Sequence, residues 1–118
     1  MPFETERSTL DSGVLILALS GSMTMGNELR RFEWMIEELA KKSQNRIVVD
    51  MSNVSYLDSS AIGVLVVCYG LLKDSGGQLR LAGLTSRVAT VFKMCGVDGL
   101  LPTNQTRDEA VSAITLGA

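Results

Sequence analysis

Apolar and polar residues follow one another along this chain in blocks that fit strands and helices in turn. Residues 14–19 and 46–51 are short, largely apolar runs rich in branched side chains, typical of strands covered on both faces. Between these runs, apolar side chains recur every three or four residues, which predicts a helix that begins near Asn27 and has one apolar face. The residues on that face are Leu29, Phe32, Ile36 and Leu39.

The rest of the pattern extends this alternation to the end of the chain. Residues 3–9 fit an edge strand, and residues 78–83 and 100–103 fit two later strands. Further helices are expected after Asp58, from Ser86 to Met94 or Cys95, and after Thr106, where Glu109 completes a capping box. Residues 20–26 are expected to form a loop. The predicted order is β-β-α-β-α-β-α-β-α.

This order predicts an α/β fold with a mixed, mostly parallel sheet of four or five strands and about four helices. The 118 residues are expected to form one domain spanning 1–118, since no linker or internal repeat divides them. No charged or low-complexity segment stands apart from the pattern.

Composition narrows the possible functions. The chain has 11 Lys and Arg against 13 Asp and Glu, without a basic cluster, so we expect no nucleic-acid binding. It has no histidine, which excludes Ser-His-Asp and Cys-His nucleophiles and zinc sites that contain histidine, and we expect neither an enzyme nor a metal site. Cys68 and Cys95 lie in apolar helical pattern and are expected to be buried free thiols.

The expected location is the cytoplasm. The first residues lack the basic start and apolar run of a signal peptide. Residues 61–72, the longest uncharged apolar stretch, fall short of the roughly 18 to 20 residues that span a bilayer, so no membrane insertion is expected.

The most informative segment is Asp58-Ser59-Ser60, which leads directly into the apolar helix that follows. At a helix start, unpaired backbone N–H groups and the positive end of the helix dipole would stabilise a phosphate on Ser59. Capping chemistry alone favours a plainer interpretation, in which Ser59 is an ordinary N-cap residue. Both interpretations remain open at this point.

A helical projection of the same segment separates two faces. One face, expected to cover the sheet, carries Val64, Leu65, Cys68, Leu71 and Leu72. The other face is expected to point outward and to contact a partner, with glycines that let the partner's backbone approach closely. Its residues are Ser59, Ile62, Gly63, Val66, Gly70 and Lys73. The alternative is that other elements of the same chain pack against these glycines.

At this motif the chain resembles the STAS domain of bacterial anti-sigma-factor antagonists. Residues 58–65 are similar to the family's Asp-Ser-Ser/Thr-Gly-Leu-Gly segment, and residues 48–54 are similar to the strand and loop before it. The resemblance extends over nearly the whole chain, through residues 76–79 and 91–97. It implies that Ser59 is phosphorylated by an anti-sigma factor that is itself a serine kinase, and that phosphorylation breaks the complex.

The resemblance also implies the other partners and the contact residues. A metal-dependent serine phosphatase would restore the unphosphorylated form, and the chain itself would need no cofactor because ATP and magnesium belong to the kinase. By releasing a sigma factor, such a protein regulates transcription indirectly. The implied partner-binding residues are Asp58, Ser59, Ser60, Ile62, Gly63, Val66, Gly70 and Thr24.

Two departures from the family pattern stand out. Thr24 occupies a loop position where many family members have an acidic residue that contacts the kinase, and Ala61 replaces a common glycine. Trp34 lies off the apolar face of its helix and is either a second contact or a partly exposed side chain packed on Arg30 or Arg31.

Other functions remain as alternatives. A STAS scaffold of a stress-sensing assembly, or a subunit accessory to a lipid transporter, would use the same surface without a phosphoserine cycle. A receiver domain could use Asp50 as its phosphoacceptor, but the expected strand exits supply no acidic pair for magnesium. A small-molecule module is disfavoured because no phosphate-binding glycine motif is present. The sequence leaves the oligomeric state open.

Overall fold

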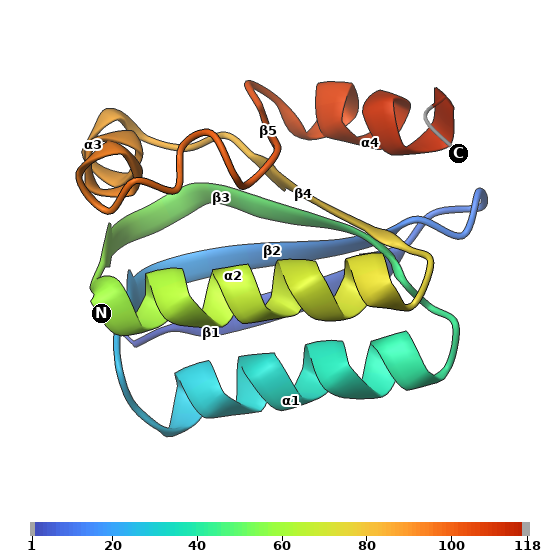
Figure 1. Cartoon of the computed structure of the whole chain (residues 1–118), viewed down its shortest axis with the longest axis horizontal. Coiled ribbons are helices and arrows are strands. Elements are labelled where there is room, and N and C mark those ends of the chain that lie inside the picture. The colour runs from blue at the N-terminus through green and yellow to red at the C-terminus, as the bar shows by residue number, and fades with distance from the viewer. Residues whose placement is uncertain (1, 117–118) are drawn as a thin grey trace.

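A five-stranded sheet with strand order β1-β2-β3-β4-β5 forms the centre of the molecule (Figure 1). The computed structural model describes residues 2–116. β1 pairs with β2 in antiparallel orientation, and the other neighbouring strands are parallel. This confirms the predicted α/β class and mixed sheet. The strands are β1 Glu4–Thr9, β2 Leu15–Met23, β3 Arg46–Leu57, β4 Gln78–Ala82 and β5 Thr103–Asn104.

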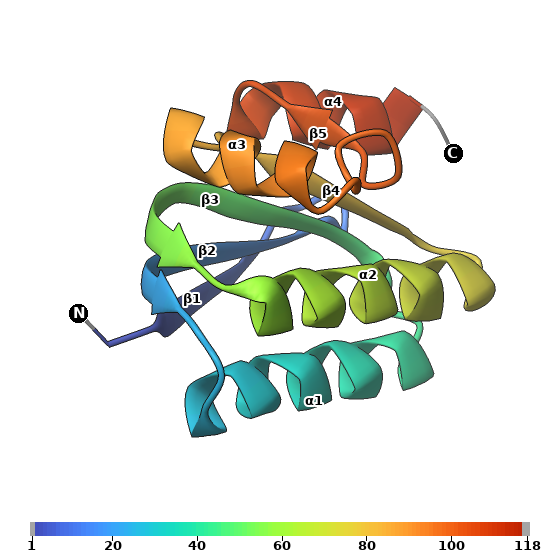
Figure 2. The same ribbon diagram turned by 60° about the vertical axis from the view of Figure 1, so that its left-hand side comes forward.

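Four helices alternate with the strands in the predicted order: α1 Asn27–Lys41, α2 Ser59–Asp74, α3 Ser86–Met94 and α4 Arg107–Leu116. α1 and α2 lie side by side on one face of the sheet, whereas α3 and α4 lie on the other side (Figures 1 and 2). Because β2, β3, β4 and β5 are parallel, their carboxyl ends lie at the same end of the sheet, and the next helix follows each of them there.

Apolar side chains from both sides of the sheet fill the core. Burial of one large aliphatic or aromatic side chain contributes about 1.5–3 kcal/mol, so the predicted apolar face of α1 fixes this helix firmly on the sheet. Fully buried side chains in the main cluster include Phe32, Ile36, Leu17, Val49, Leu65, Leu72, Leu81 and Phe92.

Two strands are longer than the apolar pattern predicts. β2 continues to Met23 through residues that were expected to form a loop, and β3 continues to Leu57 instead of ending near residue 51. The pairing of β2 with β3 shifts register between Ala18 and Ser20 and again between Gly21 and Ser22. These irregularities and the polar residues of the segment hide the strand from a periodicity argument, although Met23 and Leu57 are buried.

α4 packs on the second face through a small apolar cluster and one ion pair. The guanidinium of Arg107 lies 2.8 Å from Oδ2 of Asp50, which sits at the centre of β3. Oδ1 of Asp50 accepts hydrogen bonds from the Ser52 N–H at 3.0 Å and the Ser52 hydroxyl at 2.8 Å. Asp50 thus anchors the start of α4 to β3. Thr106 caps α4 as predicted, because its hydroxyl accepts the N–H of Glu109 at 3.1 Å.

The two cysteines differ in environment. Cys68 is buried as predicted, and burial, together with the nearby charges of Glu33 and Glu37, raises the pKa of its thiol to about 12. Cys95 is exposed, so its predicted burial is wrong. α3 ends at Met94, and Cys95 lies beyond the last full turn, where helical periodicity no longer orients it toward the core.

Among residues 2–116, none of the helices combines the length and apolar character that crossing a bilayer requires.

Candidate docking and phosphorylation site at the start of α2

Asp58 joins three segments at the start of α2. Its Oδ1 accepts the N–H of Ala61 at 3.0 Å, which makes Asp58 the N-cap of the helix. Its Oδ2 accepts the N–H of Met25, in the loop between β2 and α1, also at 3.0 Å. The backbone N–H of Asp58 donates to the carbonyl of Met23 at the end of β2. The carboxylate therefore fixes this loop and the first turn of α2 relative to each other.

Ser59 is the first residue of α2 and is exposed. Because Asp58 provides the cap, the interpretation of Ser59 as the N-cap is wrong. Within residues 2–116 the Ser59 hydroxyl has no hydrogen-bond partner, so the fold does not occupy this oxygen. It stands at the positive end of the helix dipole, beside the carboxylate of Asp58.

Ser60 is half-buried and lines a shallow hollow between the starts of α1 and α2, with a volume of about 260 Å³. The other lining residues are Met25, Gly26, Leu29, Arg30, Glu33 and Val64. Thr24 is half-buried and directly precedes Met25 in the loop that Asp58 holds. The structure thus brings Thr24 to the same end of the molecule as Asp58, Ser59 and Ser60.

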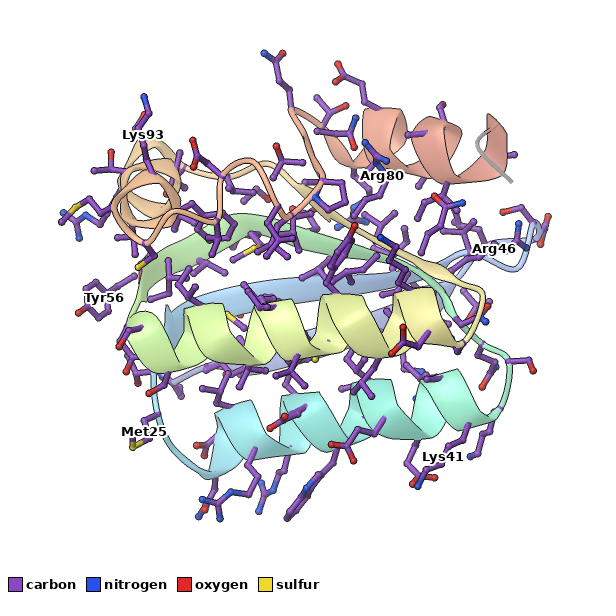
Figure 3. All side chains as sticks on the ribbon, in the orientation of Figure 1. Met25, Lys41, Arg46, Tyr56, Arg80 and Lys93 are labelled. Atoms are coloured by element: carbon purple, nitrogen blue, oxygen red, sulfur yellow. The ribbon has the colours of Figure 1, made fainter. Side chains whose placement is uncertain are left out.

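Two exposed apolar side chains flank this end of α2. Met25 is 76% exposed and Tyr56, near the end of β3, is 46% exposed. Figure 3 shows both at the end of the molecule where α2 begins. The sequence analysis did not identify these two residues as part of a binding surface. The signals that could have found them are a methionine in a loop of small residues and a tyrosine in a polar stretch. Large apolar side chains at such positions are typical of protein-binding surfaces.

The outer side of α2 differs in part from the predicted face. Ile62 is 5% exposed and belongs to the core, so its predicted outward orientation is wrong. Val66 is half-buried and packs against the core, and Val67 is 48% exposed in its place. The buried arc of α2 is wider than the projection predicts and includes Ile62, because the helix packs against β4 as well as against β3 and α1.

Gly63 and Gly70 remain on the outer side of α2. Apart from its chain neighbours and the backbone of α2 itself, a Cβ atom added at either glycine would meet no atom of the described residues within 4 Å. The alternative in which the chain's own elements pack against these glycines is therefore contradicted. Since glycine within a helix costs about 1 kcal/mol relative to alanine, two such positions need an explanation outside the fold.

Comparison with known proteins places the chain in a family. Residues 7–110 match the STAS domain model, so the chain belongs to the STAS-domain family. It is 29% identical over 104 residues to an anti-sigma F factor antagonist of Paenibacillus polymyxa, covering 87% of this chain and 86% of that protein.

Solved structures agree with this assignment. The protein TM1081 of Thermotoga maritima superimposes with a TM-score of 0.84 at 25% identity and 94% coverage of both chains. The unphosphorylated form of the anti-sigma-factor antagonist SpoIIAA superimposes with a TM-score of 0.80 at 17% identity and 98% coverage of both chains. SpoIIAA is also known in a phosphorylated form, which superimposes with a TM-score of 0.73 at 16% identity, covering 94% of this chain and 99% of that one.

Proposed function

We propose that this chain is an anti-sigma-factor antagonist of the cytoplasm. In this proposal it docks on an anti-sigma factor with serine kinase activity through the start of α2, and phosphorylation of Ser59 releases it. A metal-dependent serine phosphatase then returns the chain to its binding form. The observation that carries the proposal is the exposed, unpartnered hydroxyl of Ser59, flanked by exposed Met25 and Tyr56.

The chain acts in this cycle as an acceptor and a docking surface. The Ser59 oxygen would attack the terminal phosphoryl group of ATP held by the kinase, its proton would pass to a kinase base, and ADP would leave. The phosphatase would transfer the same phosphoryl group to water. Both steps use groups that the partners supply, so no catalytic residue of this chain is required.

The position of Asp58 explains how one phosphate could end the interaction. Phosphorylation adds about −1.5 to −2 charges, and two unit charges 4 Å apart interact by about 4 kcal/mol at an effective dielectric of 20. Asp58 already accepts the N–H groups of Ala61 and Met25. We therefore expect the new charge to leave the cap in place and to change the surface that the partner meets.

The remaining surface suits a partner that buries apolar area. Met25, Tyr56 and Val67 supply exposed apolar side chains, and Gly63 and Gly70 leave room for a close backbone approach. The shallow hollow beside Ser60 could receive one side chain of the partner. A phosphate on Ser59 would then have to be desolvated on docking, which is costly without a paired cation.

The test is phosphorylation in vitro. The chain is incubated with Mg-ATP and each small kinase encoded beside its gene, and the modified residue is mapped by mass spectrometry. We expect phosphate on Ser59 in the wild-type chain and in Ser60→Ala, and none in Ser59→Ala. Ser60 is the matched control because it is adjacent but half-buried. Phosphate on Ser60, or failure of every such kinase to modify the chain, would contradict the phosphoserine cycle and favour a scaffold role.

A further inference from the structure

The surface between α1 and α2 is hollowed at both ends. Because β2 and β3 are parallel, the helices that follow them run in the same direction and lie side by side (Figure 1). The hollow beside Ser60 lies between the starts of the two helices. A second hollow of about 360 Å³ lies between their ends. Its lining residues in the two helices are Glu37, Ala40, Lys41, Leu71 and Asp74. The surface from one hollow to the other is the α1–α2 seam.

The α2 side of the seam carries a stripe with the spacing of a coiled coil. Its members are separated alternately by four and three residues, which places them on one side of the helix. They are Ser60, Val64, Val67, Leu71 and Asp74. Val64 and Leu71 are half-buried and each lines one of the hollows, while Val67 lies between them and is 48% exposed. Residues 2–116 therefore cover this apolar stripe only in part.

Gly63 and Gly70 flank the stripe and lower the surface of α2. Beyond its chain neighbours and the backbone of α2, a Cβ atom added at either glycine would meet no described atom within 4 Å. The axes of packed helices lie about 8–10 Å apart, and the side chains at the contact decide the value. Two glycines on the same side of α2 therefore favour a further helix that lies along α2 at short separation.

The α1 side of the seam is acidic in its middle. Glu33 lines the hollow at the helix starts, Glu37 lines the hollow at the helix ends, and both are half-buried. Besides burial, the charges of these two residues raise the pKa of the Cys68 thiol, which places both carboxylates on the side of α1 that faces α2. Asp74 adds a carboxylate from α2. No ion pair within residues 2–116 involves any of these three carboxylates.

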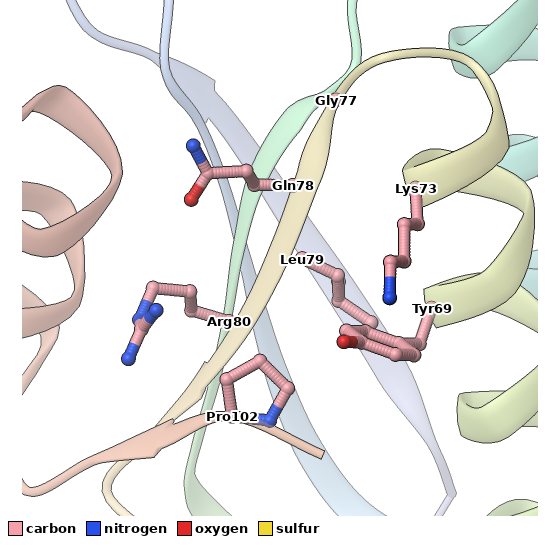
Figure 4. Close-up of a pocket in the computed structure, with 7 residues that line it drawn as sticks. All are labelled: Tyr69, Lys73, Gly77, Gln78, Leu79, Arg80 and Pro102. Carbon is pink, nitrogen blue, oxygen red and sulfur yellow. The ribbon is translucent and has the colours of Figure 1, made fainter. Parts of the chain in front are cut away.

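The cations near the seam do not neutralise its middle. Lys73, the one cation of α2, lies beside Tyr69 on the side of the helix that faces β4, with Nζ 5.8 Å from the ring centre (Figure 4). Arg30 and Lys41 lie toward the two ends of α1, and Lys41 is paired with Glu38 at 3.5 Å. The seam thus combines an apolar stripe on one helix with negative charge on the other.

We infer that the α1–α2 seam binds a basic amphipathic helix of a partner protein. The apolar side of the partner helix would lie on the stripe of α2, close to the two glycines, as in other complexes in which a helix fills a groove. Lys or Arg residues beside its apolar side would reach Glu33, Glu37 and Asp74. The 16 residues of α2 span about 24 Å at a rise of about 1.5 Å per residue, so a partner helix of four turns would cover the seam.

This inference deepens the proposed function and rests on it, because the partner that docks at the start of α2 is taken to continue along the seam. The seam begins at Ser60, next to Ser59, so a phosphate on Ser59 would add its charge at one end of the bound helix. The inference names the chemistry of the segment that the partner uses, which the phosphoserine cycle leaves open.

The test is selection of peptides from a display library on the full chain. The library holds helical peptides of about 18 residues with leucine at every third or fourth position and random residues elsewhere. We expect the enriched sequences to carry Lys or Arg beside the leucine stripe. A synthetic peptide of the consensus sequence should bind, and its variant with a central proline should bind at least about tenfold more weakly, because proline breaks the helix.

Variants of the chain locate the binding surface. Glu33→Lys with Glu37→Lys should weaken binding of the consensus peptide at least about tenfold, and Val67→Gln should weaken it about fivefold. Glu6→Lys, on exposed β1, reverses one acidic charge away from the seam and should bind like the wild type. Spectra of backbone amides by NMR confirm that each variant is folded. In the wild-type chain they should show peptide-induced shifts in α1 and α2 and none in α3.

Each of three results would overturn the inference. They are failure to enrich basic helical peptides, binding that survives the double charge reversal, and amide shifts centred outside α1 and α2. The selection uses neither a kinase nor ATP, so its outcome is separate from that of the phosphorylation test. Phosphate on Ser59 together with no basic helix at the seam would refute this inference alone, whereas a bound helix with Ser59 never modified would refute the phosphoserine cycle alone.

Discussion

The carboxylate of Asp58 accepts the backbone N–H of Met25, 33 residues earlier in the chain, while it caps α2 through Ala61. One side chain thus positions both the exposed Met25 and the first turn of the helix that carries Ser59. A change at Ser59 lies beside the group that organises the whole end of the molecule. A phosphate on Ser59 would therefore add its charge within the surface that Asp58 holds in place, next to the side chains that the partner meets.

Replacement of Asp58 should therefore destabilise the chain, whereas replacement of Ser59 should not. Loss of an N-cap costs about 0.5–2 kcal/mol, and Asp58→Ala also removes the bond to Met25, so we expect a loss near the upper end of this range. Asp58→Asn should be intermediate because its amide has only one acceptor oxygen. Ser59→Ala should change the free energy of unfolding by less than about 0.5 kcal/mol. Urea denaturation measures all three, and an equal loss in Ser59→Ala and Asp58→Ala would refute this division of roles.

Met25 and Tyr56 should contribute to partner affinity. Met25 is 76% exposed, so its truncation to alanine removes little buried area from the fold, whereas Tyr56 is 46% exposed and its truncation also removes some buried contact, so Tyr56→Ala is compared with the wild type after its fold has been checked by circular dichroism. We expect Met25→Ala and Tyr56→Ala each to weaken binding to the anti-sigma factor by about fivefold or more, measured by calorimetric titration. Leu10→Ala, an exposed apolar position in the turn between β1 and β2, is the control and should bind normally. Unchanged affinity in both test variants would place the interface elsewhere.

Gly63 should show opposite effects on stability and on binding. Since a Cβ at this position meets no atom of the described residues within 4 Å beyond its chain neighbours and its own helix backbone, Gly63→Ala should stabilise the protein by up to about 1 kcal/mol. Gly63→Gln should fold normally but bind the anti-sigma factor at least about tenfold more weakly, because the longer side chain blocks a close approach. Ala89→Gln on the exposed side of α3 controls for surface substitution in general. Full affinity in Gly63→Gln would show that Gly63 lies outside the interface.

The Asp50 anchor should make stability depend on pH in the acid range. Burial raises the pKa of Asp50. The hydrogen bonds from Ser52 and Arg107 and the charge of Arg107 lower it by more than burial raises it, so the pKa lies below its ordinary value of 3.8. A carboxyl group with a lowered folded-state pKa stabilises the fold fully above the unfolded pKa and loses this contribution as the pH falls through the folded value. The free energy of unfolding should therefore fall below about pH 4, and Asp50→Asn should flatten this decline. An identical pH profile for both chains would exclude Asp50 as a source of acid sensitivity.

The order of strands and helices was predictable because apolar periodicity records which faces are buried. The prediction from periodicity was wrong where burial depends on contacts that periodicity does not encode. β3 runs to Leu57 through polar residues held by irregular pairing with β2, and Ile62 is buried because α2 packs against β4 as well as against β3 and α1.

The candidate site was predictable only in part for a similar reason. Asp58, Ser59 and Ser60 are adjacent in sequence, so their motif is visible there. Met25 and Tyr56 come from two other segments, and only the fold brings them to the same end of the molecule.

The most direct test of the account is the affinity of the anti-sigma factor for three forms of the chain: unphosphorylated, phosphorylated on Ser59, and Ser59→Ala. Isothermal titration, with circular dichroism to confirm an unchanged fold, measures each. We expect phosphorylation to weaken binding by well over about tenfold, since it adds a charge beside Asp58, and Ser59→Ala to bind like the unphosphorylated chain before and after treatment with kinase and ATP. Equal affinity of the phosphorylated and unphosphorylated chains would contradict the central claim that Ser59 is the switch.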